Sequence, residues 1–228
     1  LRSGRRLVHG DGAREELPGP PTEAEREESE GTEVIRFAVA ALAILAGAPG
    51  PVSRDGFQVK LSEGWKESSD ITTASKERVS PLADGSAVGW EKKDNRSMAR
   101  VIWLRSKLAS KFGVREELEA FHEGAKSESD EGRVKSWEVS ETKVLMTSRL
   151  TYELGDPLEG KGSVVRQVAI AGMDKDGKIR GWTLECGYPK TAAAKAEKEC
   201  DALAASFAVT LPAKEFRTIE PKAAEKKP

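Results

Sequence analysis

The chain has 228 residues, of which 33% are charged and 38% are hydrophobic, and its formal net charge is -1. This length allows one domain with a sizeable core, and the composition is typical of a globular protein with polar extensions. Lysine and arginine are interleaved with glutamate, so no clustered basic face indicates a nucleic-acid-binding protein. We therefore expect a single domain, a monomer, that does not bind nucleic acid.

Residues 1–33 are rich in acid and precede an apolar run, whereas a secretory signal peptide begins with a short positive segment. One hypothesis is that Val34 is the true initiator and that residues 1–33 are upstream sequence that is not translated. The purine-rich codons of Glu27-Glu28-Ser29-Glu30-Gly31 would suit a ribosome-binding site there. The alternative is a disordered acidic leader followed by a buried ten-residue helix, and the sequence leaves both open.

The apolar run itself lies within "EVIRFAVAALAILAGAPG", residues 33–50. It is too short to cross a bilayer as a helix, which needs about 20 apolar residues. Its length suits the apolar region of a signal peptide, and Ala46-Gly47-Ala48 fits the cleavage pattern. We predict a signal peptide at 34–50 and an exported protein, periplasmic or secreted, with no integral membrane span after cleavage.

Residues 51–212 are predicted to form one α+β domain, because strand and helix patterns alternate along them. Alternating apolar residues predict strands at "GFQVKL", "SAVGWEKK", "SMARVIWLRSKL", "RVKSWEV", "LMTSRLTYEL", "SVVRQVAIAGM" and "KIRGWTLEC". Apolar spacings of three and four predict helices at "VREELEAFHEGAKS" and at about 190–205. This order predicts an antiparallel sheet with helices packed on it.

Three local patterns refine this plan. The segment "SMARVIWLRSKL" is apolar on both faces, which predicts a central strand covered on both sides. Asp174-Lys175-Asp176-Gly177 is a hairpin turn signal that lacks the further ligands of a calcium loop. Residues 213–228 are charged, contain proline and show no apolar period, so we predict a disordered tail there.

The two cysteines, Cys186 and Cys200, are predicted to form a disulfide. Cys186 lies on the apolar face of its strand and Cys200 on the apolar stripe of the next helix, so both sulfurs face one layer. Export would place the pair in an oxidising compartment. The alternative is two buried free thiols, as in cytosolic cores. With no histidine beside the pair, we predict no metal site.

The arrangement from "GFQVKLSEGW" to "CDALAASF" resembles the PsbP-like superfamily over about residues 55–210. The marks are a strand ending in Gly64-Trp65, a helix after the third strand, and a last helix ending in Ser206-Phe207. Members are α-β-α sandwiches that include extrinsic photosystem proteins, a Ran-binding regulator and exported bacterial proteins. The resemblance implies an α-β-α sandwich with a binding or scaffolding role, and it transfers no functional residue.

The domain contains few candidate catalytic residues. His122 flanks the apolar stripe of its helix, so we predict a surface or edge residue without a catalytic role. The sequence contains no nucleophile elbow, P-loop or dinucleotide fingerprint. We therefore expect a protein that is not an enzyme, and we assign no catalytic, cofactor-binding or metal-binding residue.

The five tryptophans are Trp65, Trp90, Trp103, Trp137 and Trp182. Most are expected in the core, because a tryptophan ring needs a large area buried. The alternative is that Trp90 and Trp137 line a groove on the sheet for a partner or an apolar ligand.

Three functions are left open by the sequence. The favoured one is an exported, non-catalytic binding or assembly module whose partner is an unknown protein or an apolar ligand. The second is a small extracytoplasmic hydrolase or ligand-processing enzyme without a recognisable motif. The third is a cytosolic protein-binding regulator, which requires that the apolar run is not a signal peptide.

Overall fold

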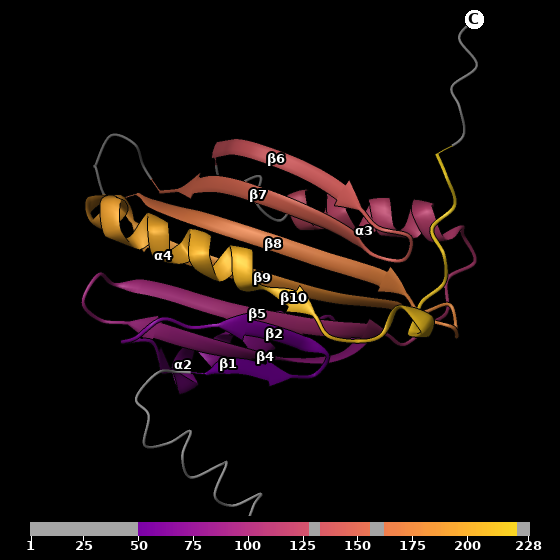
Figure 1. Ribbon diagram of the computed structural model, residues 1–228, viewed down its shortest axis with the longest axis horizontal. Helices are drawn as coiled ribbons and strands as arrows, with labels where there is room; N and C mark the ends of the chain where they lie inside the picture. Colours follow the sequence, from indigo (N-terminus) through magenta and orange to yellow (C-terminus); the bar gives the residue numbers. More distant parts are fainter. Residues whose placement is uncertain (1–49, 128–132, 156–161, 223–228) are drawn as a thin grey trace, which may run out of the picture. The chain divides into compact units, whose positions relative to one another are not determined.

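The structure, a computed structural model, describes residues 50–127, 133–155 and 162–222 (Figure 1). The predictions made for residues 1–49 lie outside these ranges. Within them, seven antiparallel strands form the main sheet in the order β3-β4-β5-β9-β8-β7-β6, and β1-β2-β10 form a small second sheet. No helix of these ranges is long and apolar enough to cross a membrane.

The main sheet is antiparallel throughout, and its strands are long except for β3; the pairing of β6 with β7 shifts register between Val134 and Ser136. Its strands are β3 (Lys66–Glu67), β4 (Ala83–Lys92), β5 (Ser97–Ser106), β9 (Ile179–Pro189), β8 (Ser163–Met173), β7 (Met146–Leu154) and β6 (Arg133–Glu141). The small sheet contains β1 (Pro51–Arg54), β2 (Phe57–Lys60) and β10 (Ala208–Val209). The helices are α2 (Ser69–Lys76), α3 (Val114–Ser127) and α4 (Ala193–Ser206). The prediction of an α+β fold with helices on an antiparallel sheet is confirmed.

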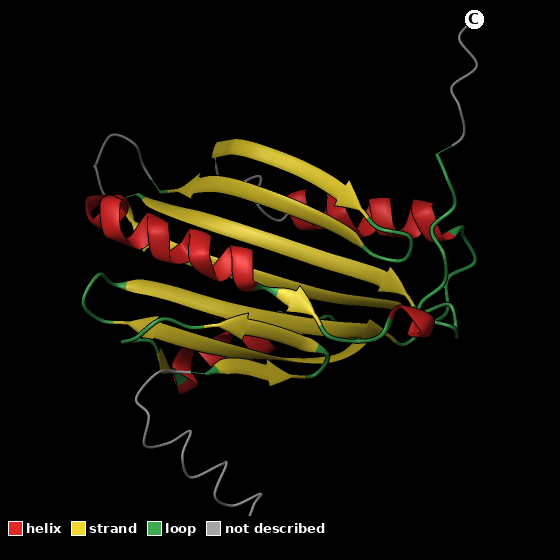
Figure 2. Cartoon of the chain, viewed as in Figure 1, coloured by secondary structure: helices red, strands yellow, loops and turns green. Residues whose placement is uncertain are grey.

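One face of the main sheet, here called the closed face, is covered by α4 and the small sheet (Figure 2). Phe57 and Val59 of β2 and Leu203 of α4 are buried in the core cluster beneath this cover. A disulfide joins Cys186 of β9 to Cys200 of α4, with their Cα atoms 5.5 Å apart. The predicted disulfide is therefore present, and it fixes α4 to the centre of the sheet.

The opposite face, here called the groove face, carries α2 over β4 and α3 over β7 and β8. Two glycines allow this close approach. A Cβ at Gly89 would lie 2.2 Å from Cγ2 of Ile71 in α2, and one at Gly181 would lie 2.6 Å from Cζ of Phe121 in α3. The two helices therefore sit tightly on separate parts of the sheet.

Strand β5 is central, as predicted, since β4 and β9 flank it. The prediction that both of its faces are covered holds only on the closed face, where Ala99 and Val101 are 1% and 0% exposed. On the groove face Met98 is 55% exposed. The reason is that α2 and α3 leave part of the sheet between them without a covering helix.

Residues 213–222 pack on the domain, so the prediction of a disordered tail from residue 213 is wrong for them, while residues 223–228 lie outside the described ranges. After a short 3-10 turn (Ala213–Glu215), Phe216 is 2% exposed and its ring lies edge-on to Trp182, with the ring centroids 6.3 Å apart. Ile219 is buried in the cluster that contains Leu118. Each apolar side chain fills its own site, which a search for apolar periodicity cannot detect.

The turn between β8 and β9 is the hairpin that its sequence predicted. Gly177 has a φ of 78°, a conformation that favours glycine. One carboxylate oxygen of Asp174 accepts hydrogen bonds from the backbone N–H groups of Asp176 and Lys178, at 2.9 and 3.0 Å. Oδ1 of Asp174 therefore holds the turn, while Oδ2 accepts from Nε of Arg105 at 2.6 Å.

Candidate functional site

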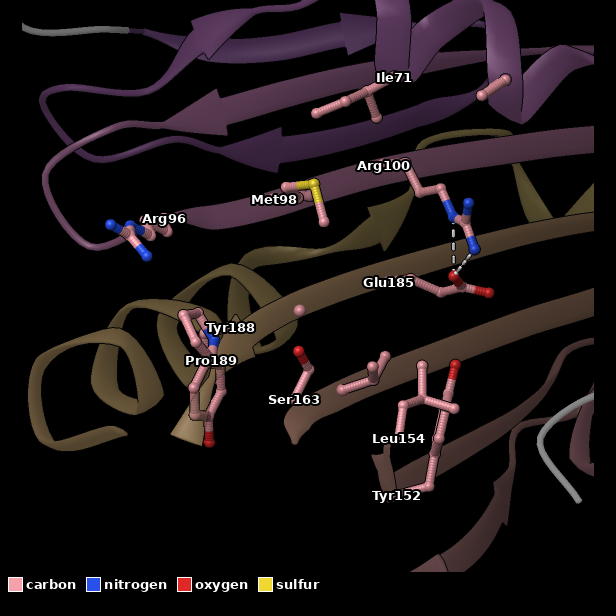
Figure 3. A pocket seen from close by; sticks show the side chains of 14 residues that line it. Ile71, Arg96, Met98, Arg100, Tyr152, Leu154, Ser163, Glu185, Tyr188 and Pro189 are labelled. Carbon is pink, nitrogen blue, oxygen red and sulfur yellow. Dashed lines mark hydrogen bonds and ion pairs between the residues drawn. The ribbon is translucent and has the colours of Figure 1, made fainter. Parts of the chain in front are cut away.

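A groove crosses the groove face of the main sheet between α2 and α3. Its more apolar part, on the α2 side, is a cavity of about 320 Å³, within the size range of small-molecule sites. Figure 3 shows side chains from β5, β7, β8 and β9 arranged around it. The lining residues are Ile71, Ala74, Arg96, Met98, Ala99, Arg100, Tyr152, Leu154, Ser163, Val165, Glu185, Gly187, Tyr188 and Pro189.

Strand alternation and register place the floor of the cavity. Gly187 of β9 lies opposite Met98 of β5 on one side and Val165 of β8 on the other. Since residues two apart on a strand share a face, Glu185 points to the same side as Gly187. A Cβ added at Gly187 would lie 3.7 Å from Cγ2 of Val165, an ordinary contact. The missing side chain at Gly187 therefore contributes directly to the open volume.

One end of the cavity is polar, because Arg100, Glu185 and Gln167 lie in register on three neighbouring strands. Nε of Arg100 donates to Oε2 of Glu185 at 2.7 Å, and a second guanidinium nitrogen binds the same oxygen (Figure 3). Arg78 approaches this oxygen at 3.4 Å, and the amide of Gln167 donates to Oε1 at 3.3 Å. Both carboxylate oxygens of Glu185 are therefore engaged.

The Glu185 side chain is 8% exposed and that of Arg100 is 27% exposed. Burial raises the pKa of the Glu185 carboxyl, while the charge of Arg78 and the hydrogen bond from Gln167 act in the opposite direction. A buried carboxylate needs such partners, since an isolated buried charge is costly. The cluster thus presents a fixed, hydrogen-bonding surface at the end of an apolar cavity.

A second cavity, of about 310 Å³, lies on the α3 side and shares Glu185 with the first. Ile102 and Leu104 of β5 and Phe121 of α3 supply apolar surface, and Gln167 and Thr183 supply polar groups. The Glu185 cluster therefore separates an apolar compartment from a mixed one along the same sheet face.

The two tryptophans proposed to line a groove do not lie in either cavity. Trp90 is 2% exposed and belongs to the closed-face core, because it follows Val88 by two positions on β4. The groove interpretation of Trp90 is therefore wrong. Trp137 lies on the edge strand β6, packs on the cluster of Leu150, Tyr152 and Val165, and has Nζ of Lys126 at 4.0 Å from its ring centroid.

His122 is buried, so the prediction of a surface or edge histidine is wrong. It lies on the stripe of Val114 and Leu118 at spacings of four, which is the face that α3 turns toward the sheet. Nδ1 lies 2.8 Å from the hydroxyl of Ser148, and Nε2 donates to the carbonyl of Met146 at 3.1 Å. Burial lowers the pKa of His122 to about 4.

This histidine and serine resemble a base and nucleophile only by distance. His122 is 1% exposed and Ser148 is 3% exposed, so a substrate could not reach either atom. The pair is a buried hydrogen-bonded contact between α3 and β7. In the ranges that the structure describes, no group of three histidine, cysteine, aspartate or glutamate side chains could hold a metal ion.

Sequence reasoning did not find Arg100, Gln167 and Glu185. A signal was present, since each is a polar residue within an otherwise largely apolar strand, in "MARVI", "VRQVA" and "TLECG", although Arg166 precedes Gln167. Only the strand order β5-β9-β8 shows that the three meet.

Comparison with known proteins leaves the family open. No protein-family model matches the chain, and no curated protein does. Among solved structures, LpqN of Mycobacterium tuberculosis, described as involved in cell envelope biogenesis, aligns with a TM-score of 0.48 and 11% identity over 71% of this chain and 90% of LpqN. A likeness of this degree supports no inference about function, and membership of the PsbP-like superfamily stays a prediction.

Proposed function

We propose that the protein is an exported, non-catalytic binding protein that holds a small molecule with an apolar body in the groove between α2 and α3. The observation that carries this proposal is the cavity of about 320 Å³, lined mostly by apolar groups and bounded by the Arg100–Glu185 cluster. Binding sites for small molecules typically combine apolar walls with a few fixed polar groups.

The polar cluster supports binding rather than catalysis. Glu185 accepts from Arg100, Arg78 and Gln167, so its oxygens are committed to structural partners. A general acid or base needs a group that is free to exchange a proton with the substrate. The cluster suits the orientation of a polar group of the ligand, while the apolar walls supply most of the contact.

Export is supported by the disulfide between Cys186 and Cys200. Disulfides persist in oxidising compartments and are rare in the cytosol. The bond fixes α4 to the closed face of the sheet, and the groove face is available for a ligand.

Filling the cavity tests the proposal. Gly187→Phe places a ring in the apolar compartment, and the contacts of the added Cβ require no backbone shift. The matched control is Ala202→Phe, which puts the same ring on the exposed surface of α4, across the sheet from the groove.

The probe is 1-anilinonaphthalene-8-sulfonate, followed by its fluorescence on titration with each folded variant. We expect the wild type and Ala202→Phe to bind the dye with equal affinity, and Gly187→Phe to bind it about tenfold more weakly, since a lost apolar site of this size removes more than 1.4 kcal/mol. Equal binding by Gly187→Phe and the wild type would refute the groove as the site.

A further inference from the structure

Two loops at one end of the main sheet carry strongly exposed apolar side chains. Leu82 precedes β4 and is 69% exposed, while Leu108 and Phe112, between β5 and α3, are 74% and 65% exposed. The backbone N–H of Lys107 donates to the carbonyl of Leu82 at 2.9 Å, which joins the two loops. We call the surface formed by Leu82, Lys107, Leu108, Lys111 and Phe112 the loop patch.

The backbone of the loop patch is held in place by hydrogen bonds. The hydroxyl of Ser106 donates to the carbonyl of Leu108 at 3.1 Å, and the hydroxyl of Ser110 accepts from the N–H of Phe112 at 2.9 Å. The N–H of Ser110 donates to the carbonyl of Gly177 at 2.7 Å. The apolar side chains therefore point outward from an anchored loop, and a soluble protein rarely presents such side chains together without a partner.

Positive charge surrounds these apolar side chains. Lys107 and Lys111 lie within the same loop, and the contact with Gly177 brings the turn that contains Lys175 and Lys178 beside it. Among the described residues, no carboxylate lies within ion-pair distance of Lys111, Lys175 or Lys178.

The two aspartates near the loop patch already have cationic partners, one outside the patch and one within it. Asp176 binds Arg105 at 2.6 Å, and Asp84 lies 3.8 Å from Lys107. Glu117 binds the hydroxyl of Ser110, and Glu116 is exposed in the first turn of α3. Lys111, Lys175 and Lys178 therefore remain as unmatched positive charges near the exposed apolar side chains of the loop patch.

We propose that the loop patch docks the protein on an anionic membrane surface. Leucine and phenylalanine at the tips of anchored loops enter the interfacial region of a bilayer, and the surrounding lysines contact lipid phosphates. The lysines between the apolar side chains favour a membrane over a partner protein, because lysine is depleted at the core of protein–protein interfaces. The role is distinct from ligand binding in the groove, whose cavities contain none of the loop-patch residues.

The test is co-sedimentation of the full chain with vesicles. One set contains phosphatidylcholine alone, and the other contains phosphatidylcholine and phosphatidylglycerol in equal amounts. We expect the wild type to bind the anionic vesicles at low salt, to dissociate as salt rises, and to bind the neutral vesicles weakly.

Two variant pairs locate the contact. Leu108→Asp/Phe112→Asp and Lys111→Glu/Lys175→Glu are each expected to lower the vesicle-bound fraction about tenfold. The matched controls are Val139→Asp, at an apolar residue that is 47% exposed on β6, and Lys198→Glu on the exposed surface of α4, and both should bind like the wild type. Circular dichroism checks that each variant is folded.

Three results would overturn the proposal: a folded wild type that binds neither vesicle, a Leu108→Asp/Phe112→Asp variant that binds like the wild type, or controls that lose binding equally. The first would exclude an anionic membrane as the occupant of the loop patch. Gly187→Phe should bind vesicles normally, so failure of the groove and failure of the loop patch give different results.

Discussion

Arg100 and Glu185 face each other across β5 and β9, and Nε of Arg100 donates to Oε2 of Glu185 at 2.7 Å. This pair forms the polar end of the apolar cavity in the groove. Since Glu185 is almost fully buried, removal of its carboxylate leaves the partly buried guanidinium groups of Arg100 and Arg78 without their shared partner.

The first prediction concerns this pair. Glu185→Leu should lower the free energy of unfolding by about 3 kcal/mol, because breaking a buried pair leaves an uncompensated charge. The double variant Arg100→Met/Glu185→Leu should recover most of this loss, since well-packed apolar residues can replace a buried pair at little cost. Urea denaturation of the four proteins in the cycle measures both effects. A double variant as unstable as the sum of the two single variants would contradict this view of the pair.

The second prediction concerns the disulfide. Cys186 and Cys200 are separated by 14 positions, and closing a loop of this length is worth about 3 kcal/mol in the chain-entropy estimate. Cys186→Ala/Cys200→Ala should therefore shift the urea midpoint downward, and reduction of the wild type should do the same. If the midpoint stays unchanged although thiol titration shows two free cysteines, the bond does not contribute to stability.

The third prediction concerns the pH dependence of His122. Its pKa of about 4 in the folded protein lies below the value of about 6.5 in an unfolded chain. The unfolded chain therefore binds the proton more readily, so the contribution of His122 is complete above about pH 6.5 and is lost as the pH falls toward 4.

The difference between the two pKa values corresponds to about 3 kcal/mol. His122→Gln should remove this component, and unfolding free energies at pH 7 and pH 4.5 should then differ less in the variant than in the wild type. An identical pH dependence in both proteins would show that His122 is not buried as a neutral ring.

The fourth prediction concerns the segment after residue 212. Phe216→Ala should lower the free energy of unfolding by about 3 to 5 kcal/mol, because it empties a buried aromatic site beside Trp182. Phe112→Ala is the matched control, since Phe112 is 65% exposed, and it should change stability by less than about 0.5 kcal/mol. Equal effects of the two substitutions would mean that this segment does not pack as described.

The sequence predicted the parts of the fold that repeat along a single element. Alternation located the long strands, and the stripe of Cys200 and Leu203 located α4 and its bond to Cys186. Alternation could not show that Met98 is exposed, because this depends on the spacing between α2 and α3 over the sheet. His122 was missed since both Phe121 and His122 fit the apolar spacing, and only packing shows that α3 turns the histidine inward.

The candidate site was beyond sequence reasoning for a related reason. Arg100, Glu185 and Gln167 come from strands far apart in the chain, and their contact depends on strand order and register. Phe216 and Ile219 likewise occupy single sites that no periodic pattern describes. Trp90 was misplaced because periodicity does not tell which sheet face is covered.

Native mass spectrometry of the protein purified from its own cells tests the central claim most directly. We predict that the wild type and Ala202→Phe carry a non-covalently bound small molecule, which is released on unfolding, and that folded Gly187→Phe carries none. The same bound mass on Gly187→Phe as on the wild type, or no bound mass on the wild type together with no dye binding, would contradict the proposal that the groove holds a ligand.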